Sequence, residues 1–252
     1  MRCFSARHFA VFLLVFFIGG LTATGATADV VYQMDVEKQS GSTLTGVATR
    51  INASRFVTDS ALVGGARTVY LIDRNVTPPA KIVADVLVAD SDSRIAVLES
   101  NNLSGGSVML AQKDQAAGGQ LALLTVSGEI GSVVQSLEPM GDLAEGLIYR
   151  HGALYKSGQW GAPVLNNCGQ LVGLSVYETG FFGGRIEPEQ VAYAQSLEML
   201  KAVMTRNDVE FGEAPDVCLS DVEQAELRAE QAARDAKAAK LEKESADREA
   251  QE

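Results

Sequence analysis

Residues that could supply a nucleophile and a general base occur close together in the second half of the chain. The sequence contains two histidines, His8 and His151, and Ser157 lies shortly after His151. A serine activated by a neighbouring imidazole is a common arrangement for acyl transfer, so hydrolysis is the first chemistry to consider. An isolated histidine is, however, more often a surface or hydrogen-bonded structural residue than a base. We therefore expect that His151 has no catalytic role and that His151→Ala leaves thermal stability nearly unchanged.

The N-terminal segment, residues 1–28, has the layout of a cleavable signal peptide. Arg2 and Arg7 precede an apolar run over residues 9–18, and small residues end at Ala26-Thr27-Ala28. The run is shorter than the roughly 20 apolar residues that span a membrane as a helix, and an uncleaved anchor is the alternative. We expect a mature periplasmic protein that begins near Asp29, has no stable membrane insertion after signal cleavage, and retains His151 as its one histidine.

Cys168 and Cys218 remain after Cys3 leaves with the signal peptide. In an oxidising compartment two cysteines most simply form one disulfide, and two free buried thiols are the alternative. Two cysteines and one histidine without C-x-x-C spacing give too few ligands for zinc, so we predict no metal site and no cofactor.

The net negative charge of the chain limits the classes of molecule that it can bind. The formal net charge of −11 becomes −13 when the signal peptide removes two arginines and no acid. An acidic surface repels the phosphates of nucleic acids and of anionic lipids, so we expect no nucleic-acid partner. A protein or peptide partner is the remaining class.

Short runs rich in β-branched residues, broken by Gly, Asn, Asp and Ser clusters, extend from residue 30 to residue 177. Examples are Thr45–Ile51, Arg55–Thr58, Thr68–Asp73, Ile82–Ala89, Ile95–Glu99, Gln120–Val126, Ser132–Leu137, Leu147–Arg150, Pro163–Leu165 and Leu171–Val176. So many short strands without intervening helical periods predict an all-β sandwich or barrel. Gly118-Gly119 falls midway and indicates a crossover between two half-domains.

Two helices are predicted after the strands. Ser196 can cap a helix over residues 196–204, whose apolar residues recur at steps of three and four. A polar linker over residues 207–218 follows, and Ser220 caps a second helix in a charged tail, residues 219–252. A heptad seam runs along this tail through Val222, Ala225, Ala229, Ala232, Ala236, Ala239, Ala246 and Ala250.

The alanine seam permits weak self-association of the tail as a coiled coil, because alanine buries little area. The favoured alternative is a solvated single helix supported by the pairs Glu230–Arg234 and Glu244–Arg248. Its acid-rich ends would repel one another in a parallel dimer.

Three segments, in order, resemble the trypsin-like serine proteases, and most closely their periplasmic high-temperature-requirement (HtrA-type) branch. Residues 56–66, FVTDSALVGGA, are similar to ILTNNHVVxGA; residues 90–98, DSDSRIAVL, to DxxxDLAVL; and residues 156–165, KSGQWGAPVL, to NPGNSGGPLL. Residues 169–174 and 191–196 are similar to the GxVIGI and GFAIPS segments that follow. The resemblance covers roughly residues 42–206. It implies two antiparallel six-stranded β-barrels over residues 29–206, with the active site in the cleft between them.

The same resemblance assigns the positions of the catalytic triad, and all three are substituted. Ala61 stands in place of the general base His, Arg94 in place of the orienting Asp, and Trp160 in place of the nucleophilic Ser. A methyl, a guanidinium and an indole cannot perform the proton transfers and the attack of the triad mechanism.

The loop formed by Gly158, Gln159, Trp160 and Gly161 is the counterpart of the oxyanion loop. It retains both glycines, so we expect the amides of Gly158 and Trp160 to form at most a weak anion or carboxylate site. The indole either fills a gap in the core or grips a ligand.

The resemblance therefore predicts a pseudoprotease that acts by binding or regulation. The alternatives are an active serine endopeptidase with a rearranged site and a structural envelope protein that acts through its helical tail. Asp92, two residues before Arg94, would share a strand face with it and could pair with it. The pair would either be solvated at the surface or cap the vacated cleft with a fixed charge pair.

Overall fold

Strands β1 to β6 close into an antiparallel barrel with the hydrogen-bonded order β1-β2-β3-β6-β5-β4, in which β4 pairs with β1. The computed structural model describes residues 30–115, 117–139, 147–151, 158–176, 192–219 and 221–249, so the predicted signal peptide lies outside the described residues. The elements of this first barrel are β1 (Val31–Lys38), β2 (Thr43–Arg50), β3 (Arg55–Asp59), α1 (Ser60–Val63), β4 (Ala66–Asp73), β5 (Ala80–Asp90) and β6 (Ile95–Glu99). In β4 the side chains alternate, with Val69 and Leu71 buried and Tyr70 half-buried, as a sheet with one face in the core requires.

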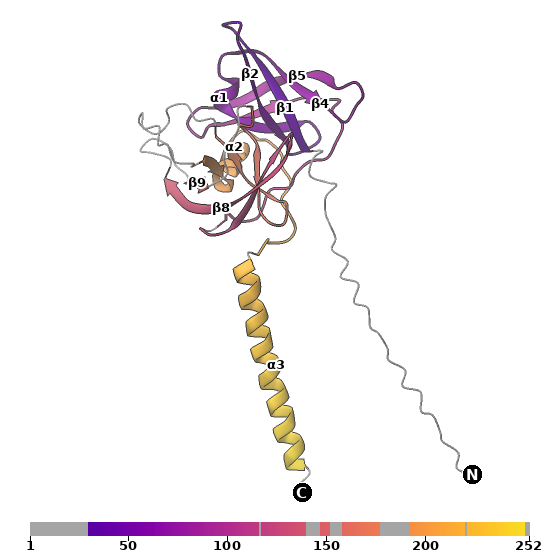
Figure 1. Cartoon of the computed structure of the whole chain (residues 1–252), viewed down its shortest axis with the longest axis vertical. Helices are drawn as coiled ribbons and strands as arrows, with labels where there is room; N and C mark the ends of the chain where they lie inside the picture. Colours follow the sequence, from indigo (N-terminus) through magenta and orange to yellow (C-terminus); the bar gives the residue numbers. More distant parts are fainter. Residues whose placement is uncertain are drawn as a thin grey trace, which may run out of the picture.

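A second closed barrel follows, in the order β10-β11-β12-β9-β8-β7 (Figure 1). Its elements are β7 (Gln120–Thr125), β8 (Gly128–Pro139), β9 (Leu147–His151), β10 (Pro163–Leu165), β11 (Leu171–Ser175) and β12 (Ala192–Ser196). The crossover between the barrels occupies residues 100–119, and the predicted Gly118-Gly119 crossover lies at its end. The predicted double-barrel, all-β fold is confirmed.

Every strand range predicted from the sequence corresponds to a strand of the structure. The largest difference is at β8, which extends beyond the predicted range at both ends. Strand β1 lies within the predicted strand region, although it is not among the named runs, and β12 lies beyond that region. β12 has the sequence AYAQS, which contains no β-branched residue, so its strand conformation depends on pairing with β9 and β11 rather than on local preference.

One hydrophobic core joins the two barrels. Val47 and Ile95 of the first barrel belong to the same buried cluster as Leu123, Val164 and Leu171 of the second. Close packing across the junction fixes the position of one barrel relative to the other, because a packed core does not deform continuously. Side chains at this junction are therefore held in defined positions.

Helix α2 (Leu197–Arg206) closes the second barrel as predicted. Ser196 is its N-cap, and its hydroxyl oxygen accepts a hydrogen bond from the Met199 amide at 3.5 Å. Leu200 and Met204 are fully buried and join the shared core.

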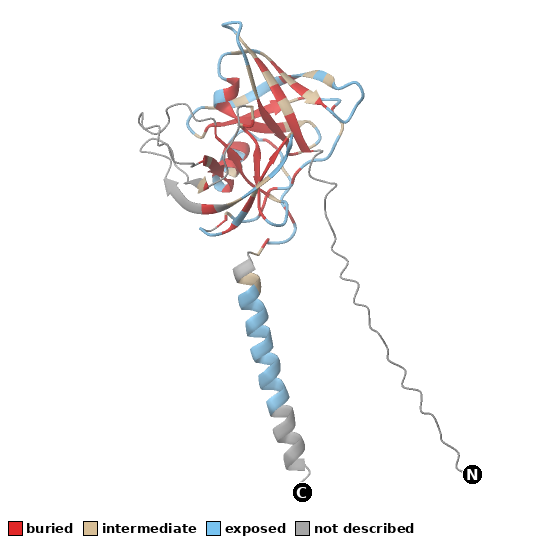
Figure 2. Cartoon of the chain, in the orientation of Figure 1, coloured by how far each residue is buried: buried red, intermediate tan, exposed pale blue. Residues whose placement is uncertain are grey.

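Helix α3 (Asp221–Glu249) projects away from the barrels (Figure 1). The side chains of residues 225–240 are all exposed in the single chain (Figure 2), and Arg234 donates to Glu230 at 3.1 Å, as predicted. The predicted cap Ser220 and the side chains of Glu244 and Arg248 lie outside the described part of the structure. No helix in the described part has both the length and the apolar character that crossing a membrane requires.

Residues 207–219, which we call the strap, lie across both barrels between α2 and α3. Asn52 of the first barrel donates its side-chain amide to the Glu210 carbonyl at 2.7 Å. The backbone of Leu110 exchanges two hydrogen bonds with the strap, donating to Gly212 and accepting from Ala214, each at 2.8 Å. The strap is thus fixed to the barrels along much of its length.

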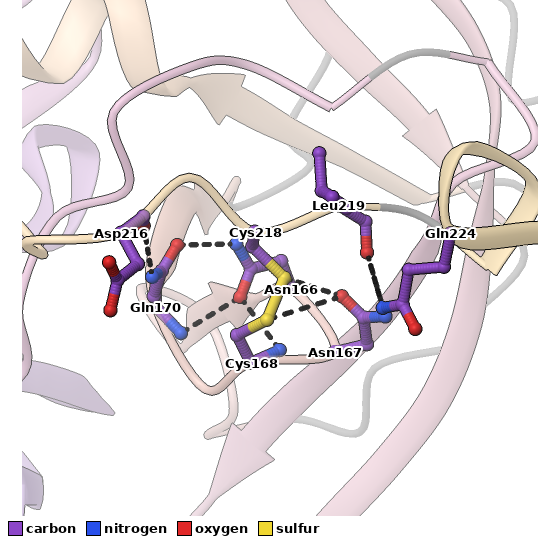
Figure 3. The surroundings of a disulfide bond; sticks show 8 residues. All are labelled: Asn166, Asn167, Cys168, Gln170, Asp216, Cys218, Leu219 and Gln224. Atoms are coloured by element: carbon purple, nitrogen blue, oxygen red, sulfur yellow. Dashed lines mark hydrogen bonds between the residues drawn. A yellow bond between two sulfur atoms is a disulfide. The ribbon is translucent and has the colours of Figure 1, made fainter. Parts of the chain in front are cut away.

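The predicted disulfide joins Cys168, in the turn after β10, to Cys218, near the end of the strap, with 5.9 Å between the Cα atoms (Figure 3). The bond closes a loop with a sequence separation of 50 residues. In the chain-entropy account a loop of this size stabilises the folded state by about 4 kcal/mol.

We predict that Cys168→Ser and Cys218→Ser each lower the free energy of unfolding by about 4 kcal/mol, because either change releases the closed loop in the unfolded chain. Chemical denaturation of oxidised protein checks this, with Ser40→Ala, an exposed loop change, as the control. Thiol titration of unreduced, denatured wild-type protein should find no free thiol. Two reactive thiols per mature chain would contradict the prediction.

Candidate functional site at the junction of the barrels

A buried ion pair lies where α1 meets the start of β6. The Arg94 guanidinium donates to the Asp59 carboxylate through Nε at 3.2 Å and through Nη2 at 2.5 Å. The side chains of Arg94 and Asp59 are 5% and 0% exposed, so water does not screen the attraction. Arg94 and Asp59 therefore form a fixed ion pair in which each charge neutralises the other.

Both partners of the pair are held by their surroundings. Asp59 is the N-cap of α1 and accepts the amide of Ala61 at 3.0 Å. The Arg94 carbonyl accepts the Ser60 amide at 3.0 Å and the side-chain amide of Gln195, from β12 of the second barrel, at 3.2 Å. Arg94 therefore connects β3, α1, β6 and the second barrel.

The expected Asp92–Arg94 pair is wrong. Residues 91–94 form a turn before β6, so the strand alternation on which the expectation relied does not apply. Arg94 has a φ of 59°, in the left-handed region, and its side chain is buried with Asp59. Asp92 is exposed in the turn, where its amide donates to Asp90.

Ala61, at the predicted position of the general base, lies in the four-residue helix α1 and is exposed. Its backbone is positioned by the same Asp59 carboxylate that binds Arg94. Its methyl group carries no acid or base.

The loop from Gly158 to Gly161 is fixed to both barrels. The Trp160 carbonyl accepts the Val47 amide of β2 at 2.8 Å, and the Gly161 amide donates to Ser175 of β11 at 3.0 Å. Gly161 has a φ of 80°, and a Cβ there would overlap the Thr58 hydroxyl oxygen. Only glycine allows this approach of the loop to β3.

The Trp160 side chain is half-buried and packs against the hydrophobic cluster of the first barrel, which includes Leu62 and Val63. Of the two predicted roles for the indole, packing is therefore observed. Gly158 keeps a turn conformation with a φ of 85°. The Gln159 side chain reaches Ser127 at 3.5 Å and its carbonyl accepts the Ser175 hydroxyl at 3.3 Å.

The structure thus brings the predicted site residues to one junction. The Ser60–Arg94 hydrogen bond places α1 beside Arg94, and a Cβ added to Gly161 would lie 3.3 Å from the Asp59 amide nitrogen. The sequence patterns do not predict Asp59 as a site residue. Asp59 could have been identified from its residue type, because an aspartate directly before a short helix is a typical N-cap.

His151 lies on β9, outside this junction, and pairs with β8 and β12. It is fully buried at 0% exposure, so its truncation would leave a cavity and the expectation of unchanged stability no longer holds. Burial lowers the pKa of His151 from 6.5 to about 4. The folded protein therefore holds the neutral imidazole.

The lowered pKa predicts an acid-sensitive stability. Below pH 6.5 the unfolded chain binds a proton at His151 that the folded chain does not bind until about pH 4. The contribution of His151 is complete above pH 6.5 and is lost as the pH falls to 4, by about 3 kcal/mol in total. We expect His151→Gln to reduce the loss of stability between pH 7 and pH 4 by that amount, measured by denaturation at each pH. Equal losses in variant and wild type would contradict the prediction.

Within the described ranges, no three His, Cys, Asp or Glu side chains lie close enough to hold a metal ion. At the junction the Asp59 carboxylate accepts the Arg94 guanidinium and the Ala61 amide.

Comparison with solved structures identifies similar folds. The chain superimposes on the active form of the Rv3671c protease from M. tuberculosis with a TM-score of 0.60 and 16% identity, covering 77% of this chain and 87% of that one. The inactive form gives 0.57 and 16%, covering 71% and 89%. The HtrA-type protease AlgW with a tripeptide gives 0.59 and 17%, covering 71% of this chain and 60% of that one.

No protein-family model matches the chain, and no curated protein matches it significantly in sequence. The structural neighbours are trypsin-like and HtrA-type serine proteases, and at these identities the likeness concerns the fold. A shared fold does not show that this chain is active. Activity depends on the side chains at the junction, which are those of Ala61, Arg94 and Trp160.

Proposed function

We propose that this chain is a catalytically inactive, trypsin-like protein of the cell envelope that acts by binding a protein or a peptide. The observation that carries the proposal is the buried Arg94–Asp59 pair at the position that the resemblance gives to the orienting carboxylate. A neutralised guanidinium cannot orient an imidazole, and Ala61 provides no imidazole. Trp160, at the proposed nucleophile position, has no group that attacks a carbonyl.

Binding is the activity that such a junction retains. An exposed Ala61 and a half-buried Trp160 lie on a rigid support, and tryptophan is enriched among the residues that contribute most to protein interfaces. The AlgW structure was determined with a tripeptide, which supports a peptide or an extended protein segment as the partner class here. As an exported periplasmic protein it would act as a decoy or as a regulator of an active protease.

The first test separates this proposal from an active endopeptidase with a rearranged site. Purified wild-type protein is incubated with a general protein substrate and with a serine-directed phosphonate label, beside an active trypsin-like protease. We expect neither hydrolysis nor labelling. Incorporation of the label at a single serine would reject the proposal.

The second test addresses binding at the junction. Peptides are titrated against wild-type protein, Ala61→Arg and Ala202→Arg, where Ala202 is an exposed residue of α2 and serves as the matched control. We expect Ala61→Arg to weaken binding at least tenfold and Ala202→Arg to leave it unchanged. Equal binding by all three proteins would place the partner elsewhere, for example on the helical tail.

A further inference from the structure

We propose that the Cys168–Cys218 disulfide is a reversible redox tether that fixes the position of α3 relative to the barrels. The tether is independent of the proposed function, because it lies at the opposite end of the strap from α2 and outside the junction site. Its role follows from how α3, the strap and the Cys168 turn are each held.

The described contacts of α3 with the rest of the chain lie in its first turn. Lys113 pairs with Glu223 at 2.7 Å, but both side chains are substantially exposed, at 46% and 40%, so solvent screens this pair and it contributes little. The Leu219 carbonyl accepts the side-chain amides of Gln224, at 3.0 Å, and Asn167, at 3.5 Å (Figure 3). Beyond this turn, residues 225–240 are exposed. The disulfide is therefore the strongest attachment close to α3.

The strap before the disulfide has attachments of its own. Gln112 donates to the carbonyls of Ala214 and Pro215, each at 3.0 Å, and Gln170 donates to the Asp216 carbonyl at 3.0 Å. Ala214 and Val209 are also buried. Reduction of the disulfide removes none of these contacts, so we expect the strap to remain in place up to Asp216.

The turn that carries Cys168 is likewise independent of the disulfide. The Asn166 side-chain oxygen accepts the amides of Cys168 and Gln170, each at 3.0 Å (Figure 3). Cys168 thus keeps its position when the bond is open. Cys218 follows the anchored Asp216 by two residues, which span at most about 7 Å, so it stays within reach of Cys168. The two thiols can therefore form the same bond again.

Cys168 is exposed and Cys218 is buried, which gives an external thiol access to the Cys168 sulfur. A dithiol reductant would attack that sulfur, form a mixed disulfide with Cys168 and release Cys218 as the thiolate. Its second thiol would then displace Cys168. The net change is transfer of two electrons and two protons, which leaves two protein thiols and an oxidised reductant.

Hydrogen–deuterium exchange of the full mature chain, with and without dithiothreitol, tests the proposal. In labelling pulses of seconds we expect reduction to accelerate exchange over residues 217–219 and 221–224 at least tenfold. Residues 209–215 and β11 (Leu171–Ser175) should stay protected in these pulses, because they exchange through global unfolding, which remains rare after the loss of about 4 kcal/mol. Removal of the reductant and addition of oxidised glutathione should restore the original rates.

Two variants complete the experiment. Cys168→Ser should match the reduced protein without any reductant, and Lys113→Ala, which removes only the exposed ion pair, should change the rates by less than about twofold. Unchanged exchange over residues 217–219 and 221–224 on reduction would overturn the proposal. Loss of protection in residues 209–215 and β11 within the same pulses of seconds would also overturn it, because the bond would then hold the barrels together rather than position α3.

Discussion

Arg94→Met is expected to lower the free energy of unfolding by about 3–5 kcal/mol, because it leaves the Asp59 carboxylate buried without its counter-charge. The amide of Ala61 remains as a partner of Asp59, but a neutral donor does not replace the charge of a guanidinium. Urea denaturation at neutral pH measures the change. The matched control is Arg67→Met, which removes an exposed pair with Glu37 and should cost no more than about 1 kcal/mol.

A double-mutant cycle separates the charge pair from the general cost of altering a buried site. Asp59→Asn keeps an N-cap side chain for α1 and removes the negative charge. Combined with Arg94→Met, it should recover at least half of the stability that Arg94→Met loses, because no charge is then buried alone. If the single and double variants are equally unstable, the two side chains do not act as a pair.

The second prediction concerns the rebuilding of a catalytic triad. Ala61→His, Arg94→Asp and Trp160→Ser supply the three missing groups, but Arg94→Asp places a new carboxylate beside that of Asp59. Two buried like charges repel, so we expect the triple variant to be unfolded or unreactive. The addition of Asp59→Asn removes the conflict. The quadruple variant should then react with a serine-directed phosphonate label at residue 160.

We expect phosphonate labelling to change from none in the wild type to a measurable amount in the quadruple variant. Triad residues act as a unit, so variants that contain only one or two of them should gain little reactivity. The matched control is the same set with Trp160→Ala, which lacks the hydroxyl and should not be labelled at that residue. Loss of the indole lowers the free energy of unfolding by up to about 3–5 kcal/mol if the surrounding side chains cannot fill the cavity. Circular dichroism must therefore confirm that the variant is folded. A folded quadruple variant without label would show that the junction differs from that of active proteases in more than these side chains.

The barrels can be predicted well from the sequence because local patterns determine most strands. Short apolar and β-branched runs such as Ile95–Glu99 and Pro163–Leu165 have the predicted bounds in the structure. The patterns do not predict β12, because its alanines carry no β preference and it forms through pairing with β9 and β11.

The site can be predicted less completely, because its central contact is not local. Asp59 and Arg94 are 35 residues apart, and nothing in the spacing relates them. The nearer Asp92 fits a strand pattern, but the left-handed backbone at Arg94 ends that pattern just before β6. The burial of His151 follows from the pairing of β9 with β8 and β12, which is also non-local.

Trp160 is the one tryptophan of the chain, and it lies in a loop of the second barrel while its ring packs on the first. Its fluorescence is therefore an intrinsic optical probe of the joint between the barrels. An indole that leaves this apolar environment for water emits at longer wavelength, so separation of the barrels would appear as a red shift without any attached dye. Stopped-flow recording of that emission would follow docking of the two halves during refolding, separately from formation of α3.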